Sequence, residues 1–269
     1  MKIPDVPKEV LVDNLILLGY RGSIAHNMYI PNTDPNSVDD IDIMGVFIAP
    51  ENFYIGLSQL RSANPQTIEI KKAIDGVLWD CVYYELRHFV KLLLRGNPNV
   101  LGMLWLKKNH YLMITEFGRM LLEKRDYFVT RNVYHSFVGY ANDQLEKMTF
   151  CSTKGYMGEK RKKLVKKYGY DIKNGAHLIR LLTIGIEFLE SGYLTVYRNP
   201  EKHAGDKHLM DIKRGGWVLE AVKDEAEKLF KVAKQAFEAS KLPGEPNFNM
   251  AEALVIHILQ DYLGKGEVI

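Results

Sequence analysis

Short apolar runs separated by turn residues fill the first third of the chain, a pattern typical of β-strands in a half-buried sheet. The runs lie at residues 15–20, 40–48, 61–71 and 76–84. Turn signals at Asn64-Pro65 and Asp75-Gly76 bound the later runs, and Pro50 closes the second. These segments predict a small mixed β-sheet, preceded by a short helix within residues 1–14.

Helical periodicity begins at Glu85, after which apolar residues recur at the spacing i, i+3, i+4, i+7 and i+8. This helix should end at Gly96, because glycine fits the C′ position and Pro98 blocks continuation. From Tyr111 onward the pattern is helical, and no β-rich block is expected there. A second short helix should follow from Asn99, and longer helices are expected at residues 114–124, 130–148, 158–168, 172–191, 216–239 and 249–263.

The two patterns together predict an α+β fold. A small mixed β-sheet core with helices should occupy residues 1–125, and an α-helical domain should occupy residues 126–269. A chain of this length has room for one large domain or two modest ones. The boundary near residue 125 is soft, since helices from both parts can pack as one body.

Composition narrows the class of protein. Of the 269 residues, 46% are hydrophobic and 26% are charged, as in an ordinary soluble domain that buries a core. No apolar stretch approaches the roughly 20 residues needed to span a bilayer, and the amino terminus lacks the apolar region of a secretory signal. With only Cys81 and Cys151, no disulfide scaffold is expected. We therefore expect a cytoplasmic protein without a membrane partner.

Asp40 and Asp42 stand at the head of an apolar run, separated by one residue. Strand side chains alternate, so both carboxylates should lie on the same face. Hard oxygen ligands suit Mg²⁺ or Mn²⁺, and two such ions roughly 3.5 to 4 Å apart stabilise an in-line displacement at phosphorus. A third carboxylate is expected. We prefer Asp80 to Glu85, because an acid in a first helical turn is explained by the helix dipole.

Gly22 and Ser23 follow the first apolar run directly. Such a turn can expose backbone N–H groups and a hydroxyl to phosphate oxygens. An isolated Asp-x-Asp is common in solvated loops. Combined with the Gly-Ser turn and Asp80, it indicates a site of nucleotidyl transfer.

These motifs resemble the DNA polymerase β-like nucleotidyltransferase superfamily, which has Gly-Ser after an apolar residue, a variable loop, Asp-x-Asp in an apolar strand and a third acid on a later strand. Residues 22–50, 79–105 and 168–182 look like the predicted nucleotidyltransferase subfamily associated with RNA-repair genes. The resemblance implies that the Gly22-Ser23 turn holds a triphosphate and that the three acids, Asp40, Asp42 and Asp80, hold metal.

The chain also departs from the family pattern. The family commonly has a basic residue and then glycine after Gly-Ser, whereas this chain has Ile24 and Asn27. The loop before Asp40 is longer than usual, and His26 stands where tyrosine is common. His26 is as compatible with an incidental surface position as with a substrate contact.

A segment rich in basic residues lies between Lys154 and Lys173. It contains Lys154, Lys160, Arg161, Lys162, Lys163, Lys166, Lys167 and Lys173, with Tyr156, Tyr168 and Tyr170 interleaved. Basic clusters attract phosphate backbones, and tyrosines stack on unpaired bases. The segment therefore favours a nucleic acid or nucleotide partner over a merely solvated helix face.

Lys173, His177 and Arg180 fall at i, i+4 and i+7 and so share one face of a helix. On that face they could neutralise phosphate charge, and the resemblance places them among recurrent motif residues. The structural alternative is a hydrogen-bonded core His177 and a buried, ion-paired Arg180. Lys213 and Arg214 are a weaker candidate for a phosphate contact.

The sequence thus predicts a metal-dependent nucleotidyltransferase that moves a nucleoside monophosphate from a nucleoside triphosphate, such as ATP, to a hydroxyl acceptor and releases pyrophosphate. RNA is the expected acceptor. Two alternatives stay open: a catalytically silent nucleic-acid-binding or regulatory module, and an enzyme that nucleotidylates a protein.

Overall fold

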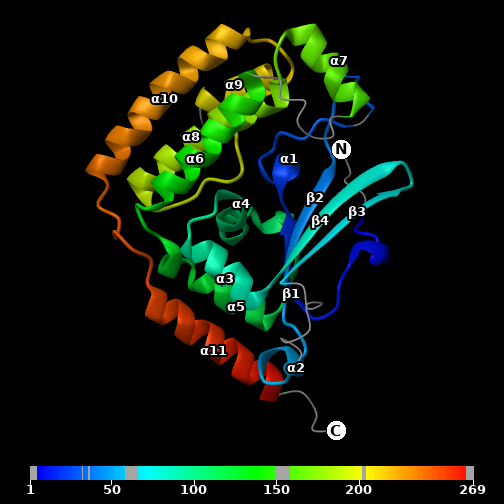
Figure 1. The fold of residues 1–269 in the computed structure, drawn as a ribbon, viewed down its shortest axis with the longest axis vertical. Helices are drawn as coiled ribbons and strands as arrows, with labels where there is room; N and C mark the ends of the chain where they lie inside the picture. The colour runs from blue at the N-terminus through cyan, green and yellow to red at the C-terminus, as the bar shows by residue number, and fades with distance from the viewer. Residues whose placement is uncertain are drawn as a thin grey trace.

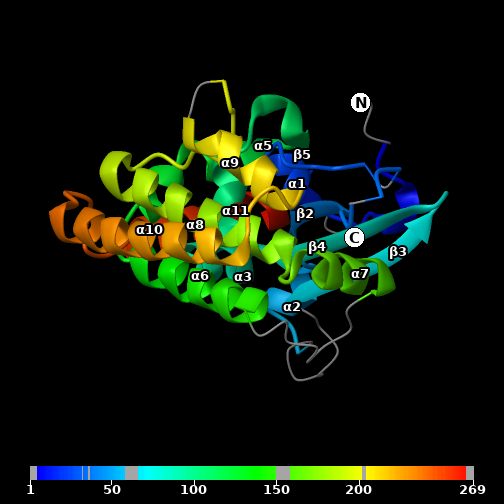
Figure 2. The same cartoon turned by 90° about the horizontal axis from the view of Figure 1, so that it is seen from above.

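The computed structural model describes residues 5–31, 33–35, 37–57, 66–149, 158–201 and 204–264. These residues form a five-stranded sheet in the order β3-β4-β2-β1-β5, with the long helices gathered beside it (Figures 1 and 2). The carboxyl-terminal part is mainly helical. The predicted α+β class is confirmed.

The strands lie close to their predicted positions. They are β1 Leu15–Tyr20, β2 Ile41–Phe47, β3 Thr67–Ile74, β4 Val77–Glu85 and β5 Tyr111–Ile114. β2 and β4 run parallel, and the other neighbouring pairs are antiparallel. Asp75 and Gly76 form the predicted β3–β4 turn, both with positive φ. Residues 61–65 of the expected third strand, with Asn64-Pro65, lie outside the described residues.

Two predictions for short segments are wrong. β5 pairs with β1, although no strand was expected after Tyr111. Its four residues are too few to give a clear alternating pattern. The helix expected within residues 1–14 is reduced to a 3₁₀ turn at Lys8–Val10, because Pro7 and Leu11 on either side of it are extended.

Most predicted helices are confirmed within a few residues. The helices are α1 Gly22–Ala25, α2 Glu51–Tyr54, α3 Leu86–Leu94, α4 Pro98–Leu101, α5 Glu116–Glu123, α6 Val133–Thr149, α7 Glu159–Tyr168, α8 Ile172–Ser191, α9 Ala204–Lys213, α10 Leu219–Ala239 and α11 Phe248–Gly264. α9 was not expected. Its inner face buries charged Asp206 and Lys213 beside Leu209 and Ile212, which hides the apolar periodicity.

α8 is the central helix of the second half, with α6, α9 and α10 packed on it. α11 then returns along the outside to pack on α3 and α5 of the first half (Figure 1). One hydrophobic core runs from Ile16 in β1 to Ile258 in α11. The opposite sheet face, with Ile43, Trp79 and Tyr83, forms a smaller core. The division at residue 125 stays a prediction.

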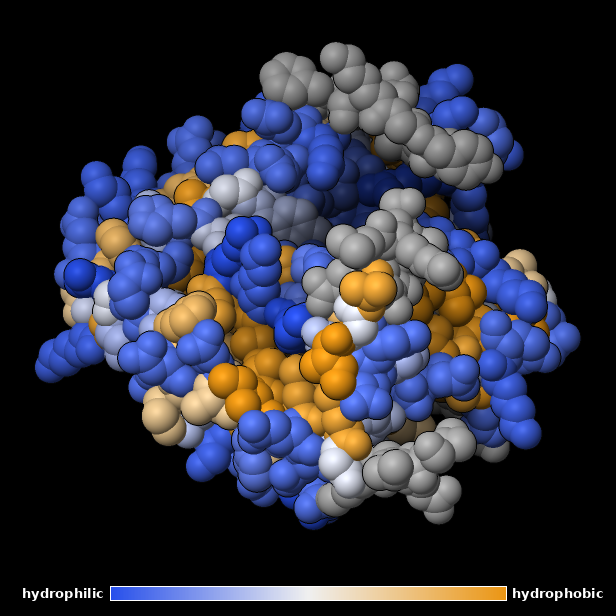
Figure 3. Space-filling model, turned by 60° about the horizontal axis from the view of Figure 1, so that its bottom comes forward, coloured by the Kyte–Doolittle hydropathy of each residue, from blue (hydrophilic) through white to orange (hydrophobic). Residues whose placement is uncertain are grey.

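On the face seen in Figure 3, hydrophobic residues gather near the centre and hydrophilic residues surround them. Among the described helices, none combines the length and apolarity that crossing a bilayer requires.

Candidate active site

Asp42 and Asp80 lie side by side on the parallel strands β2 and β4, which pair them directly. Asp40 immediately precedes β2. Burial raises the pKa of Asp42 to about 6, and Asp80 and Asp40 add to this rise while Arg21 opposes it. Burial also raises the pKa of Asp40, with further contributions from Asp80 and Asp39. The structure thus brings the three predicted acids close enough to influence one another's charge.

Glu85, the competing acid, has a different position. Its carboxylate accepts hydrogen bonds from the backbone N–H groups of Arg87 and His88 and so caps α3. It also accepts a bond from the Tyr54 hydroxyl at 2.8 Å. These contacts account for the burial of Glu85 without a catalytic role.

Arg21 bridges the two acidic strands. Its Nη2 atom lies 2.8 Å from Asp80 Oδ1 and 3.8 Å from Asp42 Oδ1. Lys71 on β3 lies 3.0 Å from the other oxygen of Asp80. The sequence reasoning missed both cations. Arg21 was recognisable, because antiparallel pairing of β1 with β2 brings the residue before Gly22 next to Asp42.

A divalent cation fits the donor set of this site, although the described residues contain no preformed group of three or more metal-binding side chains. The available donors are carboxylate oxygens, the ligands that Mg²⁺ and Mn²⁺ prefer. The raised pKa of Asp42 also reflects buried negative charge that a cation would stabilise. Asp40, Asp42 and Asp80 are the residues that would hold it.

Gly22 is glycine for a geometric reason. Its φ is +58°, and a Cβ atom there would lie 2.2 Å from Asp42 Oδ2. A side chain would therefore displace the carboxylate of Asp42 as well as strain the backbone. The adjacent Ser23 hydroxyl is buried and finds no hydrogen-bond partner in the part of the chain that the structure describes.

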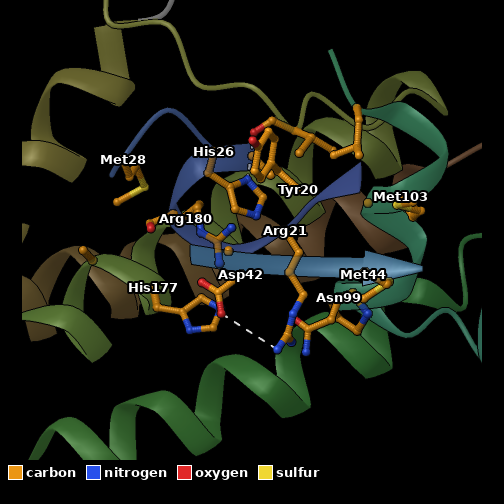
Figure 4. A pocket seen from close by; sticks show the side chains of 18 of the residues that line it. Tyr20, Arg21, His26, Met28, Asp42, Met44, Asn99, Met103, His177 and Arg180 are labelled. Carbon is orange, nitrogen blue, oxygen red and sulfur yellow. Dashed lines mark hydrogen bonds and ion pairs between the residues drawn. The ribbon is translucent and has the colours of Figure 1, made fainter. Parts of the chain in front are cut away.

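A cavity of about 230 Å³ opens between the Gly22-Ser23 turn, the end of β2 and the helices of the second half. Its polar lining includes Arg21, Ser23, His26, Asp42, Lys173, His177, Arg180 and Lys213. Figure 4 shows Asp42, His177, Arg180 and His26 converging on this space. Lys173, His177 and Arg180 thus line the same cavity as Gly22, Ser23 and Asp42, whereas Asp40 and Asp80 are not among the lining residues.

Arg180 is buried, and no hydrogen bond or ion pair joins it to another described residue. Burial lowers the pKa of Arg180 to about 9. His177 lies edge-on to Tyr140, and its buried Nε2 atom has no partner. Burial lowers its pKa to about 4. Within the described chain, these two residues therefore lack the ion pair and the hydrogen bond that a purely structural role would require.

The loop before Asp40 is held by lysines from two distant helices. Lys213 on α9 donates to Asp39 Oδ2 and to the carbonyl of Met28, both at 2.5 Å. Lys173 on α8 donates to the carbonyl of Val38 at 3.1 Å and lies 3.6 Å from Asp39 Oδ1. Asp39 is fully buried. The sequence reasoning missed Asp39, although it stands directly before the acid pair.

The end of α1 is tied to the segment that follows α8. His26 Nδ1 is 2.8 Å from the carbonyl of Val196, and the Asn27 amide donates to the carbonyl of Arg198 at 2.9 Å. Arg198 is itself fixed by Glu187 and Asp206. The position of the Gly-Ser turn therefore depends on both halves of the chain.

The structure bears on some of the aromatic and basic residues that the sequence offered as nucleic-acid contacts. Tyr170 is fully buried and donates to the carbonyl of Trp217, so stacking on a base is excluded for it. Trp79 and Trp105 are buried in the core. Lys154 and Tyr156 lie outside the described residues.

A comparison with protein families identifies a family that matches most of this chain. The model of the RlaP family, described as an RNA repair pathway DNA polymerase beta family, matches residues 16–249. This range includes the sheet except Leu15, the cavity and helices α1 to α10. No curated protein matches the chain.

Proposed function

The chain belongs to the RNA repair pathway DNA polymerase beta family, and from that premise we propose that it transfers a nucleoside monophosphate from a nucleoside triphosphate to a hydroxyl group of RNA. The observation that carries the proposal is the cavity beside Asp42. It contains two buried polar groups that have no partner among the described residues, namely the Ser23 hydroxyl and the Arg180 guanidinium.

A triphosphate complements the charge of this cavity. Four cationic side chains line it (Arg21, Lys173, Arg180 and Lys213), against the single carboxylate of Asp42. Arg21, Lys173 and Lys213 already contact acids, whereas Arg180 contacts none among the described residues. A buried charge without a partner is costly, so an anion that fills the cavity is favoured. Ser23 offers a hydroxyl to the same phosphates.

The reaction forms a bond between the acceptor oxygen and the α-phosphorus and breaks the bond to the bridging oxygen of pyrophosphate. In the proposal, Asp80 accepts the proton of the acceptor hydroxyl, while Lys173 and Arg180 neutralise charge on the leaving pyrophosphate. Asp40, Asp42 and Asp80 would hold Mg²⁺ or Mn²⁺, with two ions proposed. When bound, such ions supply positive charge to the attacking and leaving oxygens.

Asp42→Asn tests the proposal. The parent is incubated with Mg²⁺, labelled nucleoside triphosphates and RNA, and both labelled RNA and pyrophosphate are quantified. We expect the variant to lose at least about 100-fold in turnover, since the charge stabilisation removed is worth several kcal/mol. Asp143→Asn, at an exposed position on α6, is the matched control and should retain parental turnover. Parental turnover by a folded Asp42→Asn protein would refute the site.

One observation favours the alternative of a catalytically silent RNA-binding module: Arg21 and Lys71 already neutralise Asp80. The same experiment separates the candidates. Salt-dependent RNA binding without metal-dependent turnover would support the silent module. Label found on protein instead of RNA would change the acceptor while keeping the chemistry.

A further inference from the structure

α7 presents a row of lysines to solvent and buries little of its own surface. Leu164 is its one fully buried residue. The exposed lysines are Lys160, Lys162, Lys163, Lys166 and Lys167. The helix contains a single acid, Glu159, which pairs with Lys162 at 2.8 Å. The helix therefore carries a large excess of positive charge.

Three of these lysines form no ion pair with a described acid, although Lys163 interacts with Glu159 at longer range. Lys163 and Lys166 form no ion pair, and the ammonium of Lys167 lies 4.8 Å from the ring centre of Tyr168. Positions 163, 166 and 167 are spaced i, i+3 and i+4, so their side chains are neighbours on the helix surface. Like charges at this spacing destabilise a helix. A polyanion lying along α7 would relieve the repulsion.

Ion pairs and hydrogen bonds fix α7 beside the candidate active site. Arg161 donates to Asp171 at 2.8 Å and to Asn174 at 2.9 Å. Asp171 caps α8 through the backbone N–H of Lys173, a residue that lines the cavity. Lys160 reaches the carbonyl of Asp34 at 3.1 Å, in the loop that leads to Asp40. The lysine row is thus attached to the start of α8 and to the loop that leads to Asp40 and Asp42.

α7 lies on the same side of the molecule as the β3–β4 hairpin, which carries Asp80 (Figures 1 and 2). The hairpin adds positive charge there, since Lys71 contacts Asp80 and Lys72 is exposed. A chain of phosphates could follow α7 and end at these strands.

Resting on the function proposed above, we propose that α7 binds the phosphate backbone of single-stranded acceptor RNA and directs its terminal hydroxyl toward Asp42 and Asp80. The helix has 10 residues and is therefore about 15 Å long, enough to contact several phosphates. Recognition through lysines depends on charge and not on base sequence. A flexible single-stranded end can bring its hydroxyl to the cavity.

Salt-dependent RNA binding tests this surface. Fluorescence anisotropy of a labelled single-stranded RNA is measured across a salt series, without nucleotide or divalent cation. The variants are K163Q/K166Q/K167Q in α7 and the charge-matched K228Q/K231Q/K234Q in α10. The α10 lysines are also exposed, on a helix that runs down the left side of Figure 1, whereas α7 lies at the upper right.

We expect the α7 variant to bind RNA more weakly and to lose about 2 from the slope of log K against log salt, since each phosphate contact contributes about 0.7 for a single strand. The α10 variant should keep the parental slope. An equal loss in both variants would mean that only net charge matters and would overturn the proposal. An unchanged slope in the α7 variant would overturn it too.

Turnover by the parent and RNA binding by the α7 variant, measured together, separate this inference from the proposed function. Turnover by the parent together with unchanged RNA binding by the α7 variant would refute the docking surface alone. Loss of RNA binding in the α7 variant, with no turnover in the parent, would refute the transfer reaction and leave the docking surface standing.

Discussion

Gly22 lacks a side chain because the carboxylate of Asp42 occupies the space where a Cβ would lie. We expect Gly22→Ala to reduce turnover at least as strongly as loss of the Asp42 charge, since the methyl group would meet Oδ2 at 2.2 Å. It should also lower the free energy of unfolding by about 1–3 kcal/mol through backbone strain. Turnover and denaturant unfolding are the two measurements.

Gly76→Ala is the matched control for that substitution. Gly76 also has a positive φ, of +76°, but no heavy atom lies within 4 Å of its Cβ position. The control should therefore show the backbone cost, about 1 kcal/mol, without loss of turnover. If both variants retained turnover, the contact between Gly22 and Asp42 would have no bearing on the site.

The buried His177 makes the free energy of unfolding depend on pH. Burial lowers its pKa to about 4, whereas an unfolded histidine titrates near 6.5. Below pH 6.5 the unfolded chain gains a proton that the folded chain does not, so stability falls as the pH falls toward 4. Between pH 7.5 and pH 5 this single group should cost up to about 2 kcal/mol.

His177→Gln should remove this part of the pH dependence. Denaturant unfolding of the parent and the variant at the two pH values is the measurement. The parent should lose up to about 2 kcal/mol more than the variant on acidification. Identical losses would show that the pKa of His177 is not lowered in the folded protein, so that the residue is protonated at pH 5.

Sequence spacing was sufficient to identify residues whose partners are close in the chain or one strand away. The Asp-x-Asp pair, the Gly-Ser turn and the helix face of Lys173, His177 and Arg180 all follow from local periodicity. Arg21, Lys71 and Asp39 were missed because their meaning comes from cross-strand register or from contacts between distant helices.

At the scale of elements, a buried ion pair between Lys213 and Asp39 holds α9 to the loop that precedes β2. Lys213→Met would leave Asp39 buried with only Lys173, at 3.6 Å, to compensate it. We expect the free energy of unfolding to fall by about 3–5 kcal/mol, because removing one partner of a buried pair leaves an uncompensated charge. Denaturant unfolding measures the loss.

Two further variants complete this test. Asp39→Asn combined with Lys213→Met should recover about 1–3 kcal/mol relative to additive losses, since the residues interact directly. Lys228→Met, which breaks the exposed pair with Glu225, should change stability by about 0.5 kcal/mol or less. A loss for Lys213→Met as small as that of Lys228→Met would contradict the assigned role of the pair.

Whole elements were predictable where apolar periodicity was clean. α3 and α8 bury regular apolar stripes, β1 is a continuous apolar run, and β2 is apolar apart from Asp42. α9 was not predictable because charged residues occupy its buried face. β5 was not predictable because pairing with β1, more than its own four residues, makes it a strand.

For the whole molecule, the shared core implies one cooperative unit. The core includes residues from β1 through α11, and α11 packs back onto α3 and α5. We expect tryptophan fluorescence and far-UV circular dichroism to report a single coincident unfolding transition in denaturant. Trp79 reports on the sheet and Trp217 on the region around α9. Two separate transitions would instead favour independent domains that divide near residue 125.

The long reach of Lys213 back to Asp39, across 174 positions of the chain, bears on how the protein is made. A ribosome completes the acidic strands well before it synthesises α8 and α9. Until then the nascent chain contains the clustered carboxylates but lacks Lys173 and Lys213, which hold the loop before Asp40. It also lacks Arg180, which lines the cavity. Prematurely terminated translation products therefore lack a formed pocket, and competence to act on nucleotides arises only when α9 has been synthesised and docked.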